Sequence, residues 1–284
     1  MIDHYKSQTL CIATKHGKEK VIARPLFHAL GLNSVVPPEL DTDSLGTFSG
    51  EVKRKGTMSE VCIQKARLGM HAAGTSLGVA SEGSFGPHPR FFFIPGGIEV
   101  MTFVDDESRF TVTESFVTEK TNYANFVARD CSEIADWLAR VQFPSHALIV
   151  RPKSAPLGTY LVKGIQSMRM LHDAVTHASK ASEDGFALIE TDMRAHVNPL
   201  RMASIRKLAI RLARRIATTC PGCGLPGWGR TDVVVGLPCE SCGSATENIL
   251  REVFTCVKCS HKEELPRRDG VGCATVRYCP FCNP

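Results

Sequence analysis

The sequence predicts an α/β fold, in which an N-terminal domain with a mixed sheet is followed by a small C-terminal double zinc ribbon. Helical and strand-like hydrophobic patterns alternate through the first two thirds of the 284-residue chain, as is typical of α/β domains. Of the 12 cysteines, all but Cys11, Cys62 and Cys131 lie beyond residue 219. We therefore expect three segments: an α/β domain over residues 1–198, a basic linking helix over 199–217 and zinc ribbons over 218–284.

The first half of the α/β domain begins with an apolar strand over residues 9–14 and a helix that ends before Gly31. Residues 33–56 are rich in Pro, Gly and Asp, which predicts a loop. Thr57 and Glu60 have the spacing of a capping box, so a second helix should run from there to Gly74. The same patterns predict a strand at 77–80, a turn at 81–89, and further strands at 91–94, 98–104 and 110–117.

The second half of this domain continues the alternation. Apolar runs predict strands at 147–150 and 186–189, and helical spacing predicts helices at about 132–141 and 165–180. Asn198 and Pro199 supply an N-cap and a first-turn proline for the linking helix. The basic residues of that helix either form a solvated face, which we favour, or contact phosphate or nucleic acid.

Four Cys-x-x-Cys pairs are the most specific motif in the chain. Such a pair forms a tight turn that directs two sulfurs at one tetrahedral ion, and two pairs complete a four-cysteine site. Neighbouring pairs close shorter loops than alternate pairs, so we predict two successive structural zinc sites. The ligands are Cys220, Cys223, Cys239, Cys242, Cys256, Cys259, Cys279 and Cys282.

The alternative for these cysteines is a set of disulfides. The N-terminus lacks the pattern of a signal peptide and no apolar run approaches the ~18 residues of a membrane span. We therefore expect a cytoplasmic protein with no membrane contact, where reduced cysteines bind metal. Cys273 and His261 lie near the pairs, and we expect neither to be a ligand.

Charge gives little information about partners until zinc is included. Residues 199–284 carry 13 Lys and Arg against 7 Asp and Glu, a formal +6. Eight thiolates with two Zn²⁺ would reduce this value to about +2. Aromatic and basic residues between the cysteine pairs, such as Trp228, Phe254 and Phe281, either contact nucleic acid or form the core and rim of the ribbon.

Three motifs lie in order at the front of the chain: Ile12-Ala-Thr14-Lys-His16-Gly-Lys18, Thr57-x-x-Glu60-x-Cys62-x-x-Lys65-Ala66 and Ala80-Ser-Glu82-Gly-Ser-Phe. Over about 90 residues they resemble the inosine triphosphate pyrophosphatase family. The first is similar to the family's opening strand and phosphate loop, the second to a helix with the pattern T-x-x-E-x-A-x-x-K-A, and the third to the acidic turn that follows this helix.

This resemblance implies a Mg²⁺-dependent nucleoside triphosphate pyrophosphohydrolase. It implies Glu60 and Glu82 as catalytic or metal-binding carboxylates. The implied contacts with the nucleotide or another phosphorylated ligand are Thr14, His16, Lys18, Lys65, Arg90, Asp192, Arg194 and His196.

The chain departs from the family pattern at four places. His16 replaces an Asn, Lys18 stands one position early, Val61 replaces a polar residue, and Ser81 replaces the first acid of the turn. Glu60 is equally explained as a capping-box residue, and Lys65 as a solvated helix charge. A changed substrate or a lost activity would account for these departures.

The chain also contains the segments Ser81-Glu-Gly-Ser-Phe-Gly-Pro-His-Pro89 and Glu190-Thr-Asp-Met-Arg-Ala-His196 and a cysteine-rich end. With these segments, nearly its full length resembles a bacterial family described only as a domain of unknown function, which implies no activity. The leading hypothesis is therefore a nucleotide-processing α/β domain with structural zinc ribbons. The alternative is a zinc-ribbon adaptor that binds nucleic acid or a protein partner without catalysis.

Overall fold

The computed structural model describes residues 3–38, 40, 56–132, 134–156 and 159–284. The chain forms two compact units, Met1–Ala213 and Arg214–Pro284. Part of the loop predicted at 33–56 lies outside the described residues, and its first residues instead form a short strand, β2. Among the described residues, no helix is long and apolar enough to cross a membrane.

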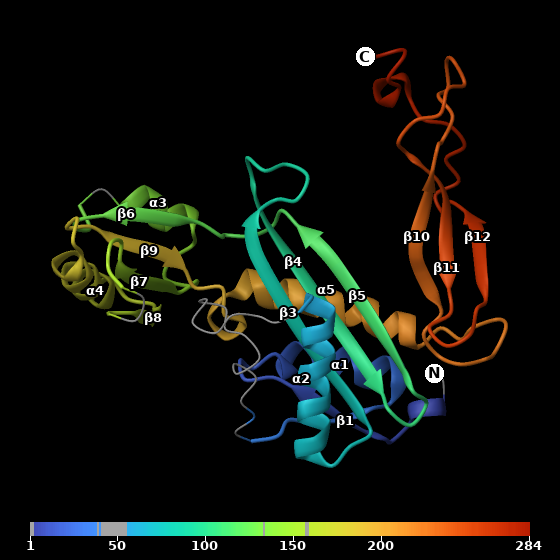
Figure 1. Cartoon of the computed structure of the whole chain (residues 1–284), viewed down its shortest axis with the longest axis horizontal. Coiled ribbons are helices and arrows are strands. Elements are labelled where there is room, and N and C mark those ends of the chain that lie inside the picture. The colour runs from blue at the N-terminus through green and yellow to red at the C-terminus, as the bar shows by residue number, and fades with distance from the viewer. Residues whose placement is uncertain (1–2, 39, 41–55, 133, 157–158) are drawn as a thin grey trace. The chain divides into compact units, whose positions relative to one another are not determined.

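The first unit contains a five-stranded mixed sheet in the order β2-β1-β3-β4-β5. Strands β1, β3, β4 and β5 of this sheet are labelled in Figure 1. Strand β1 is parallel to both of its neighbours, and β3, β4 and β5 form an antiparallel meander. The predicted mixed α/β fold is confirmed. The strands are β1 (Thr9–Ala13), β2 (Asn33–Val35), β3 (Leu77–Pro87), β4 (Pro95–Asp105) and β5 (Phe110–Thr118), preceded by the 3-10 helix η1 (Asp3–Tyr5).

Two helices make the parallel connections. Helix α1 (Glu19–Leu30) joins β1 to β2 and ends at Gly31, whose φ of 71° is the left-handed conformation that glycine favours. Helix α2 (Met58–Ala73) leads into β3, and the predicted capping box between Thr57 and Glu60 is present at its start. These local signals set the helix ends as the sequence predicts.

The sheet has different neighbours on its two faces. Ala80 of β3 and Val104 of β4 pack with Ala66 and Met70 of α2. Because side chains alternate along a strand, the adjacent residues of β3 and β4 point to the opposite face. There Glu99 of β4 meets helix α5 (Pro199–Ile216).

The segment predicted as an acidic turn is a strand. Residues 81–87 continue β3 and pair with β4 in an unbroken antiparallel register, which compensates for the weak strand propensity of two glycines and two serines. The predicted strand at 91–94 is instead part of the connection between β3 and β4. His88 Nδ1 accepts hydrogen bonds from the amides of Arg90 and Phe91, and Phe92 is 82% exposed.

A second, four-stranded sheet in the first unit has the order β6-β9-β7-β8. Its own hydrophobic core includes Trp137, Leu148, Leu171 and Ile189. The predicted helix at 165–180 begins later than expected, because Ile165 ends a strand and Ser167 caps the helix. The elements are β6 (Asn125–Ala128), α3 (Ala135–Arg140), β7 (Leu148–Pro152), β8 (Val162–Ile165), α4 (Met168–Ala181) and β9 (Ala187–Thr191).

Helix α5 follows the 3-10 helix η3 (Ala195–Val197) and starts at Pro199, as predicted. Asn198 caps it by accepting a hydrogen bond from the amide of Arg201. The side-chain nitrogen of Asn198, Nδ2, also donates to Asn122 Oδ1, so the capping residue joins the start of α5 to the segment before β6. The apolar stripe of α5 is buried at Ile205, Leu208, Leu212 and Ile216.

The second unit is built on a three-stranded antiparallel meander, visible in orange and red in Figure 1. Its strands were not predicted from the sequence. They are β10 (Gly229–Val235), β11 (Ile249–Thr255) and β12 (Lys262–Pro266), and a last 3-10 helix, η4 (Val276–Tyr278), precedes the final cysteine pair.

Candidate functional site

The eight predicted zinc ligands form two groups of four cysteines, but with a different pairing from the predicted one. Cys220 and Cys223 lie with Cys256 and Cys259, and Cys239 and Cys242 lie with Cys279 and Cys282. The prediction that neighbouring pairs share a site is therefore wrong: alternate pairs share it. We call these groups cluster 1 and cluster 2 in that order.

The meander explains why alternate pairs meet. Each cysteine pair stands before or after a strand, and each strand reverses direction, so the first and third pairs reach one end of the sheet and the second and fourth reach the other. The seven residues of β10 separate these ends by about 20 Å. Alternate pairing lengthens each closed loop roughly twofold, which costs only about 0.6 kcal/mol per site.

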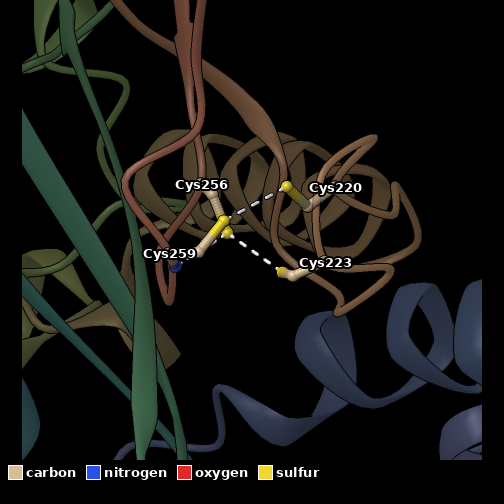
Figure 2. A group of neighbouring side chains, drawn as sticks. All are labelled: Cys220, Cys223, Cys256 and Cys259. Atoms are coloured by element: carbon tan, nitrogen blue, oxygen red, sulfur yellow. Dashed lines mark hydrogen bonds between the residues drawn. The ribbon is translucent and has the colours of Figure 1, made fainter.

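The geometry of both clusters suits tetrahedral zinc. Figure 2 shows the four sulfurs of cluster 1 pointing toward one another, with two cross-pair Sγ–Sγ distances of 3.7 Å. The corresponding distances in cluster 2 are 3.5 and 4.0 Å. A Zn–S bond of about 2.3 Å gives a tetrahedral edge of about 3.8 Å, whereas a disulfide bond is about 2.05 Å long. The two groups can therefore hold two zinc ions.

The backbone around the cysteines supports the sulfurs as metal ligands. In each pair, the first sulfur accepts an amide hydrogen bond from a residue two or three positions later. Gly224 and Gly243 follow the first two pairs at φ values of 74° and 72°, and their amides close the turns on the carbonyls of Cys220 and Cys239. Such amide–sulfur bonds stabilise thiolates and orient them toward the ion.

Two of the three aromatic residues named for the ribbon belong to its core. Trp228 and Phe254 are buried with Cys220 and form the small core beside cluster 1, so they are not available to stack on bases. Phe281 remains 75% exposed. His261 contacts Trp228 and Glu263, and neither it nor Cys273 belongs to a cluster, as expected.

Five buried charged residues of the first unit form what we call the charged cluster: Lys18, Lys65, Glu82, Glu99 and Arg201. Three are residues that the pyrophosphatase resemblance implies. They come from the segment after β1, from α2, β3 and β4, and from α5. The Lys18 ammonium interacts electrostatically with each of the other four charged groups, so three buried cations meet two carboxylates and the excess charge is positive.

Lys18 occupies the place where β1 stops running beside β3. The parallel register ends at Ala13 and Ala80, and the Lys18 ammonium then donates to the carbonyl and hydroxyl oxygens of Ser81 at 2.8 and 3.1 Å. Thr14 shapes the intervening loop, because its hydroxyl accepts hydrogen bonds from the amides of His16 and Lys18. Burial lowers the pKa of Lys18 to about 8, and the Arg201 guanidinium contributes to this lowering.

The two carboxylates of the cluster are paired on opposite faces of the sheet. On the α2 face, Lys65 Nζ lies 2.8 Å from Glu82 Oε1 and 3.4 Å from Oε2. On the α5 face, Arg201 Nε lies 2.7 Å from Glu99 Oε1. Glu99 Oε2 is buried and has no hydrogen-bond partner among the described residues.

Glu99 and Arg201 were not predicted as site residues. Glu99 could have been recognised from the sequence, since it is an acid inside the apolar run predicted as a strand at 98–104. Arg201 could not, because nothing in the sequence distinguishes it from the other five basic residues of the helix. Gly83 leaves room for the pair: a Cβ there would lie 2.9 Å from both Glu99 carboxylate oxygens.

Glu60 does not join the charged cluster. Its carboxylate accepts hydrogen bonds from the amide and hydroxyl of Thr57 at 2.7 and 2.9 Å, and these bonds lower its pKa. Five helical residues, a rotation of about 500°, separate Glu60 from Lys65, so the two side chains leave α2 in different directions. Glu60 is exposed, whereas Lys65 is buried.

The predicted ligand contacts that follow β9 are Asp192, Arg194 and His196. His196 lies beside the β1–α1 loop, whereas Asp192 and Arg194 bind each other. His196 stacks on His16, with ring centroids 5.0 Å apart, which brings the segment after β9 to the β1–α1 loop. Asp192 is fully buried and binds the Arg194 guanidinium at 2.6 Å and the Gly164 amide at 3.1 Å. Arg90 is not brought to the cluster, since it follows the end of β3, about 17 Å of extended strand beyond Glu82.

The buried Lys18 predicts a specific pH dependence of stability. Its ordinary pKa of 10.5 applies in the unfolded chain and about 8 in the folded one, so the unfolded chain binds more protons between these values. Wild type should therefore gain roughly 3 kcal/mol relative to Lys18→Met as pH rises from 8 to 10.5. Urea unfolding across this range measures the difference. Lys20→Met removes an exposed neighbour, and its free energy of unfolding should change with pH as that of wild type does. The same pH dependence in Lys18→Met as in wild type would contradict the prediction.

A family model for a Domain of unknown function (DUF6671) matches residues 65–284. This range covers more than half of the chain. The chain belongs to the DUF6671 family. The matched range includes both cysteine clusters and four members of the charged cluster, while Thr14, His16, Lys18 and Glu60 precede it. A search of curated proteins finds no significant match.

Proposed function

We propose that this DUF6671 protein is a zinc-stabilised protein whose first unit binds a nucleotide, or another phosphorylated ligand, at the carboxyl end of β1. The observation that carries the proposal is the charged cluster, in which three buried cations meet two carboxylates. Burying an excess charge is unfavourable for folding alone, so a functional role for it is the economical explanation.

The topology supports the location. Strand β1 lies between β2 and β3, its two parallel neighbours, and the connections from β1 to β2 and from β2 to β3 run in opposite directions. In open α/β sheets, ligands bind outside the carboxyl ends of strands at such switch points. The loop from Thr14 to Lys18 and the start of α1 lie there, and His16 and His196 stack beside it.

The carboxylates do not form a ready magnesium site. Both Glu82 oxygens contact Lys65, one Glu99 oxygen contacts Arg201, and outside the two cysteine clusters the described residues hold no group of three metal-ligating side chains. The resemblance to the pyrophosphatase family therefore supports phosphate recognition, and the proposal includes no hydrolytic step. Any Mg²⁺ would have to arrive with the phosphates of the ligand.

Calorimetric titration of the zinc-loaded full chain tests this proposal. The probes are ribonucleoside triphosphates and inorganic tripolyphosphate, each with and without Mg²⁺. Lys18→Met should weaken binding tenfold or more, because Lys18 is the member of the charged cluster that belongs to the β1 loop, and Lys20→Met is the matched control. Lys18 is preferred to Glu82 for the test, since Glu82→Gln would also leave the buried Lys65 without its partner.

Two results would overturn the proposal. Wild type that binds none of the probes at millimolar concentration excludes a phosphate site. Equal binding by wild type and Lys18→Met places the ligand elsewhere. Release of pyrophosphate from any triphosphate, measured in the same samples, would add the catalytic step that the geometry leaves out.

A further inference from the structure

We infer that the exposed face of α5 binds the phosphate backbone of duplex nucleic acid. This inference is independent of the proposed nucleotide site. Helix α5 spans 18 residues and contains no acid. Its apolar stripe is buried, and the opposite side exposes Arg206, Lys207, Arg211 and Arg214.

These four cations form one continuous face. At 100° per residue they fall within an arc of about 140°, and they extend over about 12 Å of helix. Arg211 lies 3.3 Å from Glu114, which partly neutralises it. Among the described residues, no acid forms an ion pair with Arg206, Lys207 or Arg214. Like charges three and four residues apart destabilise a helix, so the arrangement favours a polyanionic partner.

The distribution of charge assigns this role to the helix and not to the zinc unit. Residues 199–216 contain six basic residues and no acid, while residues 217–284 contain seven of each. Eight thiolates and two Zn²⁺ then give the latter segment a formal charge of about −4. A polyanion should therefore be attracted to α5 and not to the metal-bound strands.

The composition of the face indicates which nucleic acid it suits. Single strands are bound mainly by stacking of bases on aromatic side chains. The exposed face of α5 contains Ala203 and Ile210 besides its cations, and no aromatic residue. Guanidinium and ammonium groups in a row instead suit the regularly spaced phosphates of a duplex, without base recognition.

Fluorescence anisotropy with a 20-base-pair duplex, using the zinc-loaded full chain at 50 to 200 mM salt, tests the inference. Four phosphate contacts predict a slope of about −3.6 for log K against log salt. The triple variant Arg206→Gln, Lys207→Gln, Arg214→Gln should weaken binding at least tenfold and reduce the slope by about 3. The matched control, Arg140→Gln, Arg169→Gln, Lys180→Gln, removes the same charge from exposed positions on α3 and α4 and should bind as wild type does.

Three results would overturn the inference. Wild type that does not bind the duplex at 50 mM salt leaves α5 as a solvated face. Equal losses in the two triple variants mean that only net charge matters. Tighter binding of a single strand of the same length would contradict the inference that the partner is a duplex. Circular dichroism of both variants verifies that the glutamines preserve the helix.

Discussion

Replacing Cys220 and Cys256 together by serine should leave one zinc ion per chain, whereas replacing Cys220 and Cys239 together should leave none. Cys220 and Cys256 belong to cluster 1, so this double variant loses one site and retains the other. Cys220 and Cys239 belong to different clusters, so both sites lose a ligand. Metal analysis of chains purified under reducing conditions and exchanged against a weak chelator gives the count.

The two double variants separate the possible pairings because they give opposite results. If neighbouring pairs shared a site, Cys220 with Cys239 would leave one ion and Cys220 with Cys256 none. Cys273→Ser is the control, since this cysteine belongs to neither cluster, and it should retain two ions. Identical counts for the two double variants would contradict both arrangements.

The effect on folding should be large, because zinc binding in small domains contributes about 10–16 kcal/mol at neutral pH. The core of the second unit is small, with Trp228 and Phe254 beside cluster 1. Strong chelation should therefore unfold residues 214–284 while the first unit, which has its own cores, stays folded. Hydrogen exchange resolves the two units, and protected β10 and β11 amides after metal removal would contradict this expectation.

Arg201→Met should destabilise the first unit by about 3–5 kcal/mol. Arg201 binds Glu99 at 2.7 Å and donates to the carbonyl oxygen of Met193, and both charged side chains are almost completely buried. Removing the guanidinium leaves a buried carboxylate without its partner and a carbonyl without its donor. Urea unfolding followed by circular dichroism on the zinc-loaded chain measures the loss.

Two further variants show that the effect belongs to this ion pair. Arg206→Met, on the exposed face of the same helix, should change stability by less than about 0.5 kcal/mol. The double variant Glu99→Gln, Arg201→Met should recover part of the loss, because position 99 then no longer carries a buried carboxylate that has lost its guanidinium partner. A loss below about 1 kcal/mol for Arg201→Met would mean that water reaches Glu99 and the pair is not isolated.

Local signals in the sequence determined where α1, α2 and α5 begin or end and which cysteines are metal ligands. The Thr57 capping box, Gly31 and the Asn198-Pro199 start act within one turn of the chain, so they can be read without knowing the fold. The cysteine spacing is equally local, since two residues between sulfurs suffice to form each turn.

Only the tertiary structure decided how distant segments meet. Residues 81–87 are a strand because β4 pairs with them, against the local preference of their glycines and serines for a turn. The cysteine pairs alternate because β10, β11 and β12 reverse direction between them, and a loop-entropy difference of about 0.6 kcal/mol per site cannot oppose sheet pairing.

Some residues of the candidate site were predicted from the sequence, and others were found only in the structure. The resemblance implied Lys18, Lys65 and Glu82, which lie together in the fold. It also implied Glu60, whose carboxylate instead binds Thr57. Glu99 and Arg201 stand 102 positions apart, so no local pattern joins them. Sequence specifies interactions within a few residues, whereas a buried ion pair between a strand and a distant helix exists only once both are packed, because desolvation gives it its strength.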